Sequence, residues 1–216
     1  MKISRLEFLL NSKSVLLKKI YYFYNIYIRN FKFLFNGSQF GESKKILKHF
    51  KNKYKGKYVD LGCFHPTRHN NTIELYRKNW KGINVDLSST TIDLFNFHRP
   101  NDINIKCAVS SKNAIRTYYF KDKISPLNTL EKSQLSFLKK KFNIQKKDLK
   151  KLKIKTQTLK QILKRCKFFN IDFLNIDIEG HELKVLQNFN FKLFKIHLIC
   201  LEMLKNNKKS IVNSLK

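Results

Sequence analysis

Acidic side chains are concentrated at one place in a strongly basic chain. The protein has 45 Lys and Arg residues against 15 Asp and Glu residues, yet four of the acids fall between residues 171 and 182. They are Asp172, Asp177, Glu179 and Glu182. Carboxylates can remove a proton from a substrate hydroxyl or bind a cation, so this window is the first candidate for a functional site.

The residues around these acids predict a buried strand, a turn and a helix. Apolar residues recur from Ile171 to Ile178, Gly180 supplies the turn, and a helical pattern begins at Glu182. Open α/β sheets bind ligands at the carboxyl ends of such strands. The alternative is that Glu179 or Glu182 only caps the helix and complements its dipole.

A second candidate set lies nearer the N-terminus. The first predicted strand ends in Asp60-Leu-Gly62, and the second ends at Asp86, 24 residues after Gly62. In nucleotide-binding folds a glycine lets the backbone approach the ligand, and an acid ending the second strand binds a ribose hydroxyl pair. Cys63 and Phe64 replace the further glycines of the dinucleotide fingerprint, which argues against a pyrophosphate loop. An adenosine ligand without pyrophosphate, such as S-adenosylmethionine, fits this pattern.

The loop after Gly62 holds two histidines and a helix start. His65 and His69 have a spacing that suggests metal binding, but Pro66 argues against a shared helical face, so we predict no metal site here. Asn71 with Glu74 predicts an N-cap in a capping-box-like relation.

Strand and helix patterns alternate along the chain. Strands are predicted at residues 57–61, 82–86, 103–109, 114–120, 171–178 and 196–203, and helices at 43–53, 72–79, 90–97 and 158–166. Residues 125–151 form a Lys-rich, helix-leaning insertion. The alternation predicts an α/β fold with a doubly wound, mainly parallel sheet.

The N-terminal residues differ in composition from the rest of the chain. This difference predicts a basic, aromatic helical segment over residues 1–50 and one further domain over residues 51–216. The run Tyr21-Tyr-Phe-Tyr-Asn-Ile-Tyr-Ile28 is interspersed with basic residues. Such a helix is typical of an anionic membrane interface, which would place residues 1–35 in peripheral contact with the bilayer. The alternative, which we favour, is an ordinary helix that covers one face of the domain.

Composition limits the partners and the compartment. The formal charge of +30 is compatible with nucleic acid or anionic membrane, but abundant Lys, Asn, Ile, Phe and Tyr are also what AT-rich coding produces. The cysteines form no CxxC pair and indicate core residues of a reduced, cytoplasmic protein: Cys63, Cys107, Cys166 and Cys200. The sequence predicts neither a signal peptide nor a membrane-spanning helix.

Seven segments together resemble the FkbM-type family of S-adenosylmethionine-dependent methyltransferases. They are Tyr58-Val-Asp-Leu-Gly-Cys-Phe-His-Pro66, Asn71-Thr72, Leu75-Tyr76, Asn79-Trp-Lys-Gly-Ile-Asn-Val-Asp86, Arg99-Pro-Asn-Asp102, Ala108-Val-Ser110 and Ile176-Asp-Ile-Glu-Gly-His-Glu182. The resemblance covers the chain from about Tyr58 to Met203. It implies a Rossmann-like class I methyltransferase sheet and O-methylation, often of sugars in glycans, lipopolysaccharide or secondary metabolites.

The resemblance also implies roles for individual residues. Asp60 and Gly62 would approach the methionine part of S-adenosylmethionine, and Asp86 would bind its ribose. Asp177 would close the cofactor pocket. At the substrate side would lie Glu179 and His181, the expected catalytic residues.

Methyl transfer to a hydroxyl is an in-line displacement that requires alignment and the removal of one proton. Glu179 and His181 are the nearest candidates for that base. Asp177 and Glu179 would point to one face of a continuing strand, so a divalent cation held between them is an alternative. His181 is alternatively only a helix-start residue.

The C-terminal part departs from the class I pattern. A complete sheet usually ends with two further strands, whereas only Leu204 to Lys216 follow the strand that ends near Met203. We therefore expect the sheet to lack its last two strands. A truncated or inactive methyltransferase-like binding domain is the alternative function. An RNA-directed methyltransferase is a third, although we expect no nucleic-acid partner because no RNA-binding module or amino-methylating Asn/Asp-Pro-Pro-aromatic motif is recognisable.

Overall fold

A computed structural model describes residues 6–51, 55–120, 130, 149–178, 181–187 and 189–202. The N-terminal helices are η1 (Glu7–Asn11), α1 (Val15–Phe23), the π-helical turn η2 (Tyr24–Arg29), η3 (Phe31–Leu34) and α2 (Glu42–His49). Then follow β1 (Lys57–Leu61), α3 (Ile73–Arg77), β2 (Lys81–Asp86), α4 (Ser89–His98), β3 (Ile103–Lys106), β4 (Ala108–Val109) and β5 (Ile115–Phe120). The last elements are β6 (Lys150–Gln157), α6 (Leu159–Arg165), β7 (Asn170–Ile176), α7 (Glu182–Leu186) and β8 (Lys195–Leu201).

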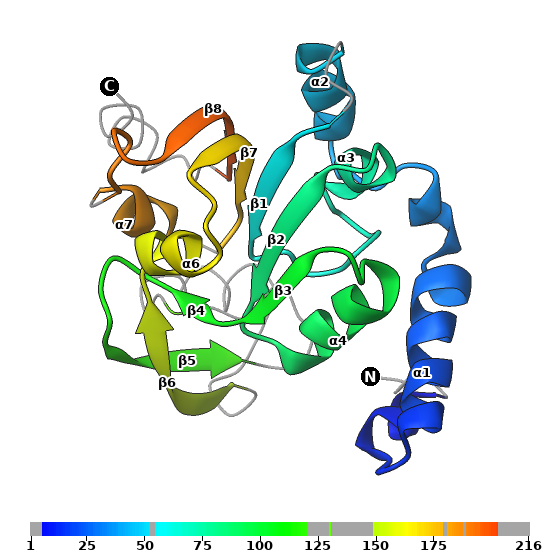
Figure 1. The fold of residues 1–216 in the computed structure, drawn as a ribbon. Coiled ribbons are helices and arrows are strands. Elements are labelled where there is room, and N and C mark those ends of the chain that lie inside the picture. Colours follow the sequence, from blue (N-terminus) through cyan, green and yellow to red (C-terminus); the bar gives the residue numbers. More distant parts are fainter. Residues whose placement is uncertain are drawn as a thin grey trace.

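The central sheet has five strands in the order β3-β2-β1-β7-β8, and every neighbouring pair is parallel (Figure 1). The chain builds outward from β1 in one direction and then continues from β7 in the other. This doubly wound arrangement confirms the α/β prediction and is Rossmann-like. The strand order reverses between β1 and β7, where open α/β sheets bind their ligands.

Each face of the sheet is buried under helices, so the side chains of the central strands are buried on both sides. Val59 and Leu61 of β1 point to the face covered by α6 and α7, in a core cluster with Ile162 and Leu186. The alternate residue Tyr58 points to the other face, where it packs with side chains of α2 and α3. Asp60 points to that second face too, which has consequences for its role.

A second, three-stranded sheet in the order β4-β6-β5 corrects two of the strand predictions. The strand predicted at 103–109 is two strands, because the backbone N–H of Cys107 bonds Asp86 and the chain then turns into the second sheet. The strand predicted at 114–120 is found as β5, but it pairs antiparallel with β6 rather than joining the central sheet. Residues 150–157, predicted in part as insertion, form β6.

The N-terminal segment packs against the outside of α4 (Figure 1). Tyr21, Tyr22 and Ile26 form a buried cluster with Leu94 of α4. The Tyr22 hydroxyl also donates to Asp93 at 3.1 Å. The segment therefore covers one face of the domain, which is the alternative that we favoured over a membrane-bound helix.

Two expectations fall on parts of the chain outside the described residues. Most of the Lys-rich insertion, at 125–129 and 131–148, is one of them. The other is the end of the sheet, because the described residues stop at Glu202, directly after β8. Within the described parts of the chain, no helix combines the length and apolar character needed to cross a membrane.

Candidate functional site

The predicted site residues line up across one edge of the central sheet. Leu61 of β1 pairs with Val85 of β2 on one side and with Ile176 of β7 on the other. The next residue in each strand is a predicted site residue, namely Gly62, Asp86 and Asp177. The structure therefore brings together residues that are far apart in sequence, at the carboxyl ends of three adjacent strands.

Gly62 has a conformation and an environment that only glycine tolerates. Its φ angle is +75°, in the left-handed region, and a Cβ at this position would lie 1.8 Å from the backbone oxygen of Asp177. The Gly62 N–H donates to Val85 at 2.9 Å, while the Asp177 N–H donates to Leu61 at 2.9 Å. The sequence predicted that Gly62 lets the backbone approach a ligand. In the structure the backbone after β7 lies against Gly62, so this glycine allows the ends of β1 and β7 to pack together at the site.

Asp86 ends β2 and organises the backbone on both sides of it. One carboxylate oxygen accepts from the Phe64 N–H at 3.1 Å, and the other accepts from the Ser88 N–H at 2.7 Å. Burial raises the pKa of this carboxyl group to about 6, although these hydrogen bonds oppose the rise. Asp86 keeps further lone pairs, so it can accept the hydroxyl pair of a ribose at the sheet edge.

Asp60 is directed away from the sheet edge into a buried polar network. Its carboxylate accepts from Asn70 at 3.1 Å, from the Thr72 hydroxyl at 2.9 Å and from Asn175 of β7 at 2.8 Å. The side chain is 1% exposed, and burial raises its pKa. In this geometry Asp60 fixes the loop between β1 and α3 and ties it to β7, and direct contact with a cofactor remains a prediction.

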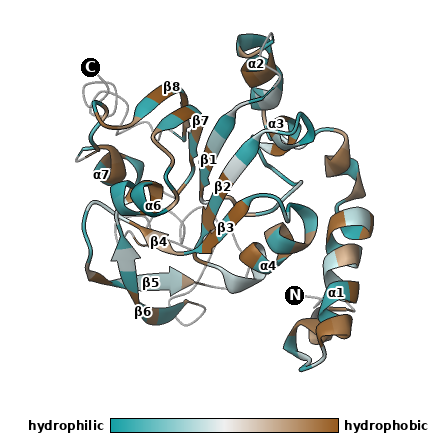
Figure 2. Ribbon diagram, in the orientation of Figure 1, coloured by the Kyte–Doolittle hydropathy of each residue, from teal (hydrophilic) through white to brown (hydrophobic). Residues whose placement is uncertain are grey.

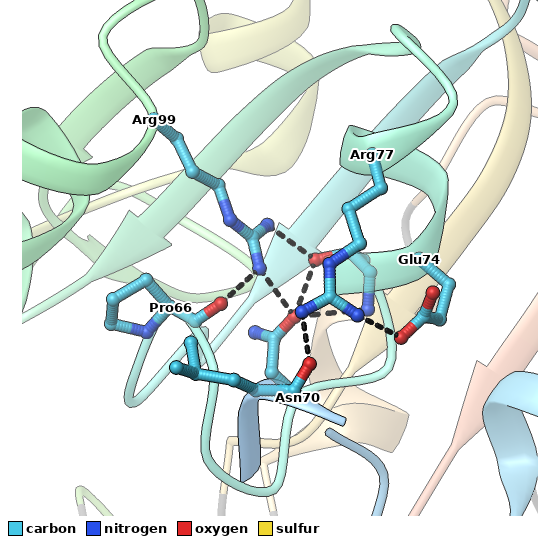
Figure 3. A network of polar contacts seen from close by, with 7 residues as sticks. Pro66, Asn70, Glu74, Arg77 and Arg99 are labelled. Carbon is cyan, nitrogen blue, oxygen red and sulfur yellow. Dashed lines mark hydrogen bonds and ion pairs between the residues drawn. The ribbon is translucent and has the colours of Figure 1, made fainter. Parts of the chain in front are cut away.

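Arg99 is the centre of the same network and was not selected as a site residue from the sequence (Figure 3). Its guanidinium group is fully buried and donates to the Pro66 carbonyl, to Asn70 Oδ1 at 2.7 Å and to the Thr72 hydroxyl at 2.8 Å. Its positive charge compensates that of the nearby Asp60 and lowers the pKa of that carboxyl group against the effect of burial. Arg99 thus holds the loop from behind the site.

The helix predicted after this loop begins one residue late. Thr72 rather than Asn71 precedes α3, and no side chain caps it. Asn71 instead donates to Asn175 Oδ1 at 3.1 Å, and Glu74 pairs with Arg77 at 2.6 Å. The capping-box prediction is wrong because the sheet offers the Asn71 amide a tertiary partner.

The acid cluster contains a member that the sequence reasoning missed. Ile176 pairs with Leu201 of β8, so Glu202 follows at the same edge as Asp177. Asp177 is exposed, but the surrounding chain desolvates its carboxyl group, and Glu202, Glu182 and Asp60 add negative charge, which together raise its pKa to about 8. Asp177 and Glu202 also share a hydrogen bond. At neutral pH the Asp177 carboxyl group therefore holds its proton, so it can both donate to and accept from a hydroxyl.

Glu182 lies in the first turn of α7, where its charge complements the helix dipole as the alternative for it proposed, but no side chain caps this helix. It is 2% exposed and begins the short helix α7. Its carboxylate accepts from the backbone N–H of Ile178 at 3.0 Å, which connects the start of α7 to the residues that follow β7.

His181 is buried at the start of α7. Its Nε2 lies 2.8 Å from the hydroxyl of Ser110, which directly follows β4. This contact connects two of the sequence segments that carried the family resemblance. Glu179 lies outside the described residues. The catalytic assignments of Glu179 and His181 both remain predictions.

The geometry of His65 opposes a metal site with His69. Its Nδ1 accepts from the backbone N–H groups of Thr67 at 3.2 Å and Arg68 at 3.0 Å, so Nε2 carries the hydrogen and donates to Asn25 at 2.8 Å. Burial lowers the pKa of His65 to about 3, which keeps the ring neutral. Among the described residues no group of three or more His, Cys, Asp or Glu side chains is placed to hold a metal ion.

A doubly wound parallel sheet, with a glycine turn and acidic residues at the carboxyl ends of its central strands, defines a Rossmann-like cofactor-binding domain. A family model described as the Methyltransferase FkbM domain matches residues 56–214. The chain therefore belongs to the FkbM methyltransferase family and is an S-adenosylmethionine-dependent methyltransferase. A search of the curated proteins found no match, and a search of the solved structures found none either.

Proposed function

We propose that this methyltransferase transfers the methyl group to a hydroxyl of a sugar or a related polyhydroxylated acceptor. The observation that carries the proposal is the position of two acidic residues, Asp177 and Glu202, directly after the paired ends of β7 and β8, where burial and neighbouring acids raise the pKa of Asp177. Such a pair can donate to one hydroxyl and accept from another, as sugar recognition requires. The same acids repel phosphate groups, which disfavours RNA as an acceptor.

In this proposal Asp86 binds the ribose of S-adenosylmethionine, and the turn at Gly62 forms the floor between Asp86 and Asp177. S-adenosylmethionine supplies an electrophilic methyl group when it is bound. Asp177, which the resemblance assigns to the wall of the cofactor pocket, would also orient the acceptor hydroxyl from there, while Glu179 or His181 removes its proton. For His181, the hydroxyl of Ser110 at 2.8 Å offers the proton a path.

Binding of S-adenosylmethionine should depend on the charge of Asp86. Because the pKa of this group is about 6, affinity should increase as pH rises through about 6 and then level off. Asp86→Asn should weaken binding at neutral pH by about tenfold to a hundredfold, the worth of hydrogen bonds to a charged group, and should remove the step near pH 6. Isothermal titration calorimetry across this range measures both effects.

The matched control is Asp93→Asn on α4, which should leave the titration unchanged, because the Asp93 carboxylate accepts from Tyr22.

Asp86 itself stabilises the folded state below pH 3.8 and loses that contribution as pH rises to about 6, because its folded pKa is raised. Weak binding at low pH is therefore distinguishable from unfolding. A well-folded protein that binds no S-adenosylmethionine would contradict the assignment, and binding without turnover on any acceptor would favour a binding domain.

His181→Asn should lower kcat for methyl transfer by about 100-fold if His181 is the base, with little change in S-adenosylmethionine affinity. Release of S-adenosylhomocysteine with monosaccharide and nucleotide-sugar acceptors measures turnover. Ser110→Ala keeps the imidazole and should shift the pH profile of kcat. Equal losses of affinity and thermal stability in His181→Asn, with no specific loss of kcat, would instead assign His181 to structure and leave Glu179 as the base.

A further inference from the structure

Helix α1 is apolar on two opposite faces. Tyr21 and Tyr22 point inward and are buried against α4. Leu16, Ile20 and Phe23 are spaced so that they share the opposite face, and they are 67%, 46% and 51% exposed. The outer face of a helix packed on a domain is normally polar, so exposed apolar side chains opposite a buried face are unusual.

Apolar residues recur through the whole N-terminal segment, which alternates between brown and teal in Figure 2. Of the fifteen large apolar side chains that are exposed in the described part of the chain, ten lie between residues 8 and 40. We call these ten the outer apolar surface: Phe8, Val15, Leu16, Leu17, Ile20, Phe23, Ile28, Phe31, Phe35 and Phe40. Concentrations of this kind on soluble domains mark interaction sites.

The charges of the segment identify the kind of partner. Residues 8 to 40 contain five basic residues and no acidic residue. Lys13, Lys19, Arg29 and Lys32 are exposed among the apolar side chains. Apolar side chains that insert below lipid headgroups, flanked by cations that reach anionic headgroups, are the combination found in interfacial helices.

We propose that the outer apolar surface docks this methyltransferase on a membrane that contains anionic phospholipids. The described helices are too short to cross the bilayer, so the segment would lie in the plane of the interface. Tyr22, Tyr27 and Ile26 would stay packed on the domain, because they face α4 rather than the outer side. Docking therefore requires no unfolding of the segment from the domain.

The docked segment is connected by hydrogen bonds to the loop between β1 and α3. Asn25 bonds His65 at 2.8 Å, and the Gly37 carbonyl accepts from the Asn70 N–H at 2.8 Å. Both loop residues precede α3 and lie beside the Asp60 network. The membrane surface would thus hold the loop, and the adjoining site, at a fixed orientation to the bilayer.

Co-sedimentation with vesicles tests the proposal. The full chain should pellet with phosphatidylcholine vesicles that contain phosphatidylglycerol, and less as salt increases. The triple variant Leu16→Ser, Ile20→Ser, Phe23→Ser should lower the partition coefficient at least about tenfold. A matched variant, Ile115→Ser, Leu152→Ser, Phe169→Ser, removes the same three residue types at 67%, 54% and 41% exposure and should bind as the wild type does.

Neither triple variant changes the charge of +30, so general attraction of the basic chain to anionic vesicles cannot produce a difference between them. Fluorescence localises the contact, because Trp80 is the only tryptophan and is buried. Phe23→Trp should add emission that shifts to the blue with vesicles, and Phe169→Trp should not. Equal binding of the two triple variants would overturn the proposal. The proposal would also be overturned if the wild type were a dimer, the α1 triple variant were a monomer, and both bound vesicles equally.

Discussion

Replacing Arg99 with methionine should lower the free energy of unfolding by about 3–5 kcal/mol, the range for removing one partner of a buried charged group. The guanidinium group is fully buried, and three of its partners belong to the loop between β1 and α3. Methionine fills a similar volume but leaves Asp60 as a buried charge without its nearby cation. Urea unfolding followed by circular dichroism measures the loss.

Arg77→Met is the matched control for this prediction. Arg77 is also drawn in Figure 3, but its side chain is 39% exposed, and its partners are Glu74 and the Leu34 carbonyl. Such an exposed pair is worth less than about 1 kcal/mol. If the two variants were destabilised equally, the buried network would not be what holds the loop.

Gly62→Ala should be about as damaging, for a steric reason. The new Cβ would lie 1.8 Å from the Asp177 carbonyl oxygen, so β1 and β7 would have to separate at the site. The left-handed conformation costs alanine about 1 kcal/mol, and the overpacking adds about 1–3 kcal/mol or more. We expect a loss of stability of several times the conformational cost alone, together with loss of S-adenosylmethionine binding.

Gly41→Ala separates the two contributions. Gly41 also has a left-handed conformation, with φ of +83°, but a Cβ there meets nothing within 4 Å. Its destabilisation in the same urea experiment should be only about 1 kcal/mol. A Gly62 variant that was no less stable than the Gly41 variant would show that the approach of β7 does not constrain this turn.

The central sheet could be predicted from the sequence because its determinants are local. The apolar runs at 57–61, 82–86 and 171–178 are each followed by a glycine, an acid or a turn, and β1, β2 and β7 are found at these places. Gly62, Asp86 and Asp177 were selected because they end strands, and parallel pairing then brings them together. The second sheet was missed although it left a signal, since Leu152, Ile154 and Thr156 alternate with lysines in β6.

The polar network could not be predicted because its contacts are tertiary. Nothing in the local sequence distinguishes Asn175, which points from β7 to Asp60, from an ordinary strand residue. Asn71 has the features of an N-cap but finds a partner across the sheet. Glu202 follows an apolar strand as Asp177 does, and only the register between β7 and β8 reveals that the two acids adjoin.

The hydrogen bonds between the N-terminal segment and the loop after β1 mean that residues outside the family match support the loop beside the site. The family match begins at residue 56, yet a chain cut there would lose the side chain that accepts from His65 and the carbonyl that accepts from Asn70. It would also expose Leu94, which α1 now covers. We therefore expect a chain that begins at residue 56 to be less stable than the full chain, because residues 6–51 supply contacts that the loop after β1 and α4 would lose.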